Sequence, residues 1–162
     1  MPWRTYTAAS ALVVDDGRLL MIRERRPSGL WWSVAGGYAE AGESLEETAA
    51  RENEEETGVA VSVGSFVCTL VWDDAAKERR NVVAYFEAAT AGEPAPRPQT
   101  DEQIEAVEFV VPTSLDRGGI HPQTRAVLDR WWPLRGDCPP FHLAADVVTR
   151  PGSDAAEYVF RP

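Results

Sequence analysis

Three glutamates, Glu52, Glu55 and Glu56, are spaced so that an α-helix would bring their carboxylates together. At about 100° per residue they fall within an arc of about 100° on the helix surface. Leu45 and Ala49 occupy the neighbouring stripe, which places the carboxylates at the edge of the buried face. Like charges one turn apart destabilise a helix by roughly 0.2–0.5 kcal/mol per pair, so this cluster requires a cation. Oxygen ligands without His or Cys favour Mg²⁺, or else Mn²⁺.

Both ends of this helix are marked in the sequence. Ser44 followed three residues later by Glu47 is the pattern of a capping box, in which each side chain bonds the backbone amide of the other residue. Gly58 suits the position just after a helix, where glycine adopts the left-handed conformation at little cost. We therefore expect a helix over residues 45–57.

A glycine-rich, acidic loop is expected before the helix, at residues 36–43. It lacks the lysine of a P-loop and carries Glu40 and Glu43 instead, so a polyphosphate would have to bind through a metal. The alternative is an ordinary solvated acidic helix, in which Glu47 and Arg51 form a common surface pair. For any one of these glutamates taken alone, the solvated helix is the better interpretation. For the whole set at this spacing, the metal site is the better interpretation.

The same segment resembles the Nudix box, G-x5-E-x7-R-E-U-x-E-E-x-G-U, where U is a bulky aliphatic residue. The matching positions are Gly37, Glu43, Arg51, Glu52, Glu55, Glu56, Gly58 and Val59. Two positions depart from the pattern. Asn53 stands where the family usually has an aliphatic residue, and Ala35 stands where many members have proline. Every charged position is intact.

The resemblance implies a hydrolase that cleaves a pyrophosphate bond with the help of Mg²⁺. Its metal ligands would be Glu52, Glu55 and Glu56, together with the carbonyl of Gly36. Arg51 would orient one of these glutamates, and Glu43 would brace the loop or bind a second metal through water.

The base that activates water is left open between Glu55, Glu52 and Glu102. Small nucleotide-hydrolysing members of the family have an acid just ahead of a strand like residues 104–110, and Glu102 is the candidate here. Asp101 and Glu105 stand behind it.

The expected substrate is a small-molecule nucleotide, a nucleoside diphosphate linked to some group X. (Deoxy)nucleoside triphosphates rank first, because residues 101–110 resemble that group of the family. ADP-ribose and nucleotide sugars rank second. Arg23, Arg25 and Arg26 form a basic patch suited to the phosphates. Arg23 and Arg25 are the candidate ligands within it, and Trp31 could support a base. A nucleotide-sensing module that cleaves nothing, or an acidic protein whose helix meets a protein partner, are the alternatives.

Composition excludes several other classes. The formal charge is −10, with an isoelectric point near 4.7, which argues against binding long nucleic acid. Cys68 and Cys138 form no CxxC motif, so we expect free thiols and a reducing compartment. No signal peptide and no apolar stretch of membrane-spanning length is visible, which favours a cytoplasmic protein without a membrane partner.

The remaining chain predicts an α/β (α+β) fold in one domain, residues 1–162. Strands are expected at 5–14, 18–24, 30–34, 59–72, 81–88 and 104–110, and a second helix at about 122–134. The Nudix resemblance covers about 5–134 and implies an α/β/α sandwich with a mixed β-sheet between helices. Residues 135–162 could hold two strands around Pro151-Gly152. They would cover the pocket, extend the sheet or pair with a second subunit in a homodimer.

Overall fold

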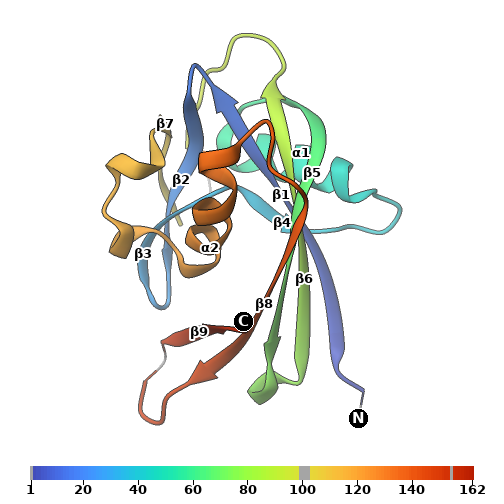
Figure 1. Cartoon of the computed structure of the whole chain (residues 1–162), viewed down its shortest axis with the longest axis vertical. Helices are drawn as coiled ribbons and strands as arrows, with labels where there is room; N and C mark the ends of the chain where they lie inside the picture. Colours follow the sequence, from blue (N-terminus) through green and yellow to red (C-terminus); the bar gives the residue numbers. More distant parts are fainter. Residues whose placement is uncertain (1, 99–102, 154) are drawn as a thin grey trace.

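The computed structural model describes residues 2–98, 103–153 and 155–162. Two α-helices and nine strands build this part of the chain (Figure 1). Four short 3-10 turns join some of them. The strands are β1 (Arg4–Asp15), β2 (Arg18–Arg26), β3 (Gly29–Ser33), β4 (Gly36–Tyr38), β5 (Val61–Asp74), β6 (Arg79–Thr90), β7 (Ile104–Val110), β8 (Phe141–Thr149) and β9 (Ala156–Phe160), and the helices are α1 (Leu45–Thr57) and α2 (Pro122–Trp131).

Helix α1 begins and ends where the sequence predicts. The Ser44 hydroxyl accepts from the Glu47 amide at 3.1 Å, and the Glu47 carboxylate accepts from the Ser44 amide at 2.8 Å. Gly58 ends the helix in the left-handed region, with φ of 71°. Local capping therefore fixes the helix that carries the box glutamates.

Strand β1 lies in the interior of the sheet and pairs with β2, β4 and β6. The strand order is β3-β2-β1-β6-β5-β8-β9, while β4 pairs with β1 and β7 pairs with β2. β1 runs parallel to β6 and antiparallel to β4, so the sheet is mixed. β1 and β2 form an antiparallel hairpin, and Asp16 and Gly17 both have positive φ, as its tight turn requires.

The two helices cover opposite faces of this sheet, with α2 in front and α1 behind in Figure 1. On one face, Ala49 of α1 packs with Ala9, Ala84 and other buried apolar residues. On the other face, Trp131 of α2 packs with Leu12 and the rest of a second core. The predicted α/β/α sandwich is confirmed.

Two elements differ from the sequence prediction. Gly36–Tyr38, expected as a loop, is the short strand β4 in register with Ala8–Ser10 of β1. The sequence did not predict this strand because glycine is uncommon in strands, whereas the pairing itself uses only backbone groups. The second helix ends at Trp131 rather than near residue 134, and a 3-10 turn containing Pro133 follows it.

The C-terminal segment extends the sheet. β8 pairs in parallel with β5, and β9 folds back antiparallel on β8. The two strands predicted around Pro151-Gly152 are therefore present. In the described part of the chain, neither α-helix has the length and apolarity that crossing a bilayer requires.

Candidate active site

Two glycines of β4 let the box glutamates approach the sheet. A Cβ added at Gly37 would lie 2.3 Å from the Glu52 carboxyl carbon. The Gly36 amide donates to Glu56 Oε2 at 3.0 Å. The fixed glycine of the box is thus explained by space: any side chain at position 37 would displace the Glu52 carboxylate.

Arg51 holds the acidic side chains in position. Its Nε donates to Glu43 Oε1 at 2.6 Å, and its Nη1 donates to Glu52 at 2.9 Å and to Glu55 at 3.1 Å. Nη2 also donates to the Tyr38 carbonyl at 3.0 Å. The hydrogen bonds from Arg51 lower the pKa of Glu43 to about 2. These contacts agree with the bracing and orienting roles expected for Glu43 and Arg51, whose part in a reaction stays a prediction.

Burial makes two of the carboxylates unfavourable as anions. Desolvation raises the pKa of Glu56 to about 8, with Glu24 and Glu52 adding repulsion. Desolvation also raises the pKa of Glu52, although Arg51 opposes it. A divalent cation between these groups would offset both costs.

The donor set fits Mg²⁺ bound by few protein ligands. Among the described residues, no three His, Cys, Asp or Glu side chains converge as a ready metal cage. Mg²⁺ usually binds through one or two carboxylates, several waters and the phosphates of its substrate. Glu52 and Glu56, one helical turn apart and both beside β4, supply such a pair. The carbonyl of Gly36 is the third candidate ligand and Glu55, which is exposed, the fourth.

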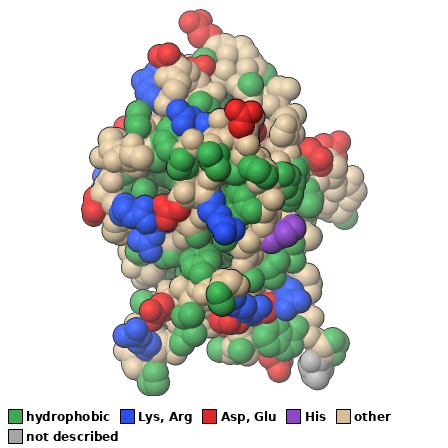
Figure 2. Space-filling model, viewed as in Figure 1, with side chains coloured by type: hydrophobic (Ala, Val, Ile, Leu, Met, Phe, Trp, Pro, Cys, Tyr) green, Lys and Arg blue, Asp and Glu red, His purple; other side chains and the backbone are tan. Residues whose placement is uncertain are grey.

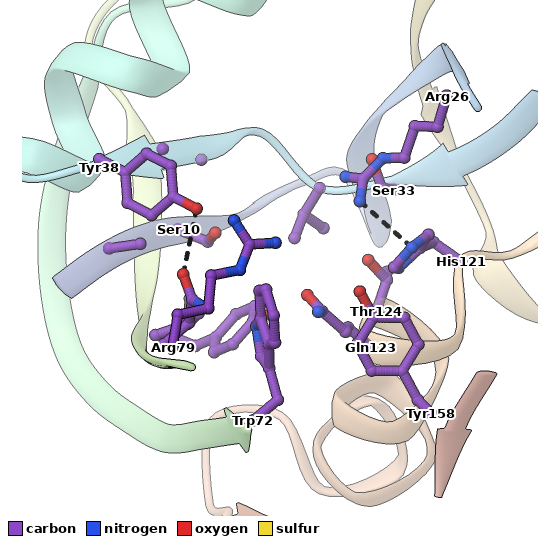
Figure 3. Close-up of a pocket in the computed structure, with 17 residues that line it drawn as sticks. Ser10, Arg26, Ser33, Tyr38, Trp72, Arg79, His121, Gln123, Thr124 and Tyr158 are labelled. Atoms are coloured by element: carbon purple, nitrogen blue, oxygen red, sulfur yellow. Dashed lines mark hydrogen bonds between the residues drawn. The ribbon is translucent and has the colours of Figure 1, made fainter. Parts of the chain in front are cut away.

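A polar cavity of about 330 Å³ opens on the other side of β4 (Figure 3). Gly36 and Gly37 form one of its borders, so the cavity and the box glutamates share this strand. Alternate residues of β6 form its floor, and β1, β3, β5, α2 and β9 contribute the walls. The side chains that line it include Ser10, Arg26, Ser33, Tyr38, Trp72, Arg79, Asn81, Val83, Tyr85, His121, Gln123, Thr124 and Tyr158.

One wall of the cavity is a charged network around Glu24. The Glu24 carboxylate accepts from Arg26 Nε at 2.8 Å and from the Ser33 hydroxyl at 2.7 Å. Arg26 Nη1 lies 3.2 Å from His121 Nε2, as Figure 3 shows. Burial, with the nearby positive charge of Arg26, lowers the pKa of His121 to about 3. His121 is therefore neutral and accepts from Arg26.

The residues proposed from sequence to bind substrate lie outside this lining. Arg23 and Arg25 are exposed; Arg25 pairs with Glu105, and Arg23 lies 5.9 Å from the Trp32 ring. Trp31 packs edge-on against His121 at 5.7 Å but is not among the lining residues. Their binding roles stay predictions.

The sequence prediction did not select Glu24 and Arg26, which alternate with Arg23 and Arg25 along β2. Arg26 lines the cavity, and Glu24, which anchors it, is half-buried. The period of two along a strand was the available signal, because residues 24 and 26 share the face opposite to 23 and 25. Glu102, the remaining candidate base, and Asp101 lie outside the described residues.

The C-terminal segment completes the cavity. Tyr158 of β9 packs edge-on against Trp72 at 6.0 Å and against His121 at 5.5 Å. Arg161, just after β9, bonds Asp73 of β5 at 3.0 Å. Of the roles considered for this segment, the structure contains two: it extends the sheet and it lines the pocket.

Comparison with known proteins agrees with this fold and with the box. The sequence model of the NUDIX domain matches residues 4–131. The chain therefore belongs to the NUDIX domain family.

Individual relatives are more distant. A MutT-like protein from Streptomyces ambofaciens is 44% identical over 62 residues, which make up 38% of this chain and 39% of the relative. The matched segments span 13% and 39% of the lengths of two curated relatives.

Solved structures share the fold over most of the chain. A MutT NUDIX hydrolase from Burkholderia pseudomallei is 29% identical with a TM-score of 0.68, covering 78% of this chain and 97% of that one. A NUDIX hydrolase from Nitrosomonas europaea is 16% identical with a TM-score of 0.74, and the match covers 88% of this chain and 80% of that one.

Proposed function

We propose that this protein is a Mg²⁺-dependent hydrolase that cleaves a pyrophosphate bond in a nucleoside diphosphate linked to a group X. A (deoxy)nucleoside triphosphate is the first candidate substrate. One observation carries the proposal: half-buried carboxylates and a polar cavity lie on either side of the same glycine strand, Gly36–Tyr38. The phosphates would lie at the carboxylates and the rest of the nucleotide in the cavity.

Hydrolysis adds water to one phosphorus and breaks its bond to the bridging oxygen, which leaves with the other phosphate. Bound Mg²⁺ would neutralise charge on the phosphates and lower the pKa of a bound water. Glu52 and Glu56, with the Gly36 carbonyl, would hold it. Arg51 would keep the Glu52 carboxylate directed at β4 through the 2.9 Å hydrogen bond. The proton of the attacking water passes to a carboxylate, for which Glu52, Glu55 and Glu102 remain the candidates.

The cavity supplies groups for the rest of the substrate. Arg26 and Arg79 bring positive charge to an otherwise acidic protein. Trp72, Tyr85 and Tyr158 supply aromatic surface. Such a combination suits a nucleoside and its phosphates.

The test is product analysis on a substrate panel. Nucleoside triphosphates, ADP-ribose and nucleotide sugars are each incubated with Mg²⁺ and with EDTA, and the products are identified by chromatography. The proposal expects cleavage of one class, only with Mg²⁺, at a pyrophosphate bond. Binding of a nucleotide without cleavage of any of them would instead favour a nucleotide sensor.

A further inference from the structure

Two buried hydrogen-bond donors in the cavity lack an acceptor. Among the described residues, Arg79 Nε and Asn81 Nδ2 are the buried side-chain nitrogens without a hydrogen-bond partner. Leaving a buried polar group unpaired is unfavourable, because the group has lost its water without gaining another partner. Both residues line the cavity. Their coincidence in one cavity indicates a ligand that supplies the acceptors.

The sheet places these donors on one face. Arg79 and Asn81 are two residues apart in β6, and Val83 and Tyr85 continue the same row along the cavity floor. Asn81 is only 1% exposed. Solvent therefore reaches its amide poorly, and a bound group would be its natural partner.

Tyr38 engages one end of the Asn81 amide. Its hydroxyl donates to Asn81 Oδ1 at 3.0 Å, so the acceptor end of the amide is already engaged (Figure 3). Nδ2 is the atom left for a ligand. In this orientation Asn81 offers a donor.

The Arg79 guanidinium points into the same cavity (Figure 3). It lies 5.0 Å from the centre of the Trp72 ring. The nearest carboxylate, Asp74, is 3.9 Å from Nε, beyond hydrogen-bond distance. Arg79 thus keeps donor capacity for a ligand, beside the donor of Asn81.

We propose that Arg79 and Asn81 form a subsite that binds acceptor oxygens of the substrate. This rests on the proposed function in so far as the ligand is a nucleotide. The oxygens belong either to a carbonyl of the base or to a phosphate. Nothing in the Nudix box specifies this pair, because both residues lie on β6, after the box.

The test uses ITP and ATP, whose purine bases carry a carbonyl and an amino group, respectively, at the same ring position. They are used as analogues whose bridging phosphate oxygens are replaced by methylene groups, so that hydrolysis does not interfere, and their binding is measured by calorimetry with Mg²⁺ for the wild type and for Asn81→Asp. The variant keeps the shape of the side chain but replaces its donor by an acceptor. Its melting temperature reports whether it folds.

Two results support the subsite and separate the sources of the oxygen. A base carbonyl at Asn81 predicts that the wild type prefers ITP by about 10-fold and that Asn81→Asp reverses the preference. A phosphate oxygen there predicts equal binding of the two nucleotides, and a loss of about 10-fold or more for both in the variant.

Tyr38→Phe gives a second, milder test. Removing the hydroxyl frees the amide to rotate, so affinity or preference should fall by about 3-fold. Tyr6→Phe is the matched control: Tyr6 packs on Tyr38 at 5.6 Å but is not among the cavity-lining residues, and its variant should bind as the wild type does.

The proposal is overturned by unchanged binding in Asn81→Asp, by a wild-type preference for ATP, or by no binding of either nucleotide. Turnover with Mg²⁺ is measured separately. A wild type that binds ITP or ATP but cleaves no substrate would remove the proposed function and leave the subsite. Normal cleavage by the wild type, together with unchanged nucleotide binding in the variant, would remove the subsite and leave the proposed function.

Discussion

At the scale of single residues, Asn53 shows how the chain accommodates a departure from the box. Asn53 is 1% exposed and its Nδ2 donates to the Val59 carbonyl at 2.7 Å. The Thr57 hydroxyl donates to the Asn53 carbonyl at 2.6 Å and accepts from the Val59 amide at 3.1 Å. A hydrogen-bonded link between helix and following strand thus replaces the aliphatic packing expected of the family.

Asn53→Ala should lower the free energy of unfolding by about 1–3 kcal/mol, because the Val59 carbonyl loses a buried partner. Urea denaturation measures this change. Glu54→Ala, at an exposed position of the same helix, is the control and should change stability little. Equal stability of the two variants would show that the link contributes nothing.

Asp73 should make the fold sensitive to acid. Hydrogen bonds from Arg80 and Arg161 lower its pKa from 3.8 to about 2 in the folded protein. A depressed carboxyl pKa contributes stability above the unfolded value and loses it as the pH falls toward the folded value. The stability of the wild type should therefore drop between about pH 4 and pH 2 more steeply than that of Asp73→Asn. The free energy of unfolding of both proteins is measured by urea denaturation across this pH range. An equal fall with pH in the wild type and in Asp73→Asn would contradict the prediction.

At the scale of elements, the C-terminal hairpin β8–β9 lies beyond the matched family domain yet lines the cavity. Tyr158→Ala should raise the KM of the preferred substrate by about 10-fold with little change in kcat, because it removes wall surface remote from the carboxylates. Val159→Ala is the matched control, because Val159 is the next residue in β9, is 48% exposed and is not among the lining residues. A lower kcat at constant KM would place Tyr158 in the chemistry instead.

Elements with local signals were predictable from sequence. The capping box and Gly58 mark the bounds of α1. Asp16-Gly17 is a common turn sequence for a hairpin such as that of β1 and β2. β4 was not predictable, because its pairing with β1 depends on backbone contacts far along the chain. The irregularity of β5 was not predictable either: its register against β6 shifts between Val63 and Phe66.

At the scale of the whole molecule, the box glutamates were predictable and the cavity was not. The glutamates lie within one helix, so their spacing alone brought them together. The cavity draws residues from Ala8 to Tyr158, and only the tertiary arrangement of β1, β6, α2 and β9 assembles it. The proposal of Arg25 rather than Arg26 as a substrate ligand shows what the sequence could not predict. Composition identified a basic segment, but the face of the strand on which each residue lies decides which side chain lines the cavity.

The overall charge also has a consequence for partners. On the face seen in Figure 2, Lys and Arg are interspersed with Asp and Glu, and the formal charge of the chain is −10. A labelled single-stranded oligonucleotide at physiological salt should therefore bind more weakly than about 10⁻⁴ M in fluorescence anisotropy. Tighter, salt-dependent binding would indicate a nucleic-acid partner.

We propose that the box carboxylates hold the metal that drives hydrolysis. Glu56→Gln tests it most directly, with Glu54→Gln as the control on the exposed side of the same helix. Phosphate-bond cleavage of the best substrate is measured with Mg²⁺ and with EDTA, and melting temperatures confirm folding. We predict that Glu56→Gln folds but loses nearly all Mg²⁺-dependent cleavage, while Glu54→Gln retains it. Unchanged turnover in folded Glu56→Gln would contradict the site.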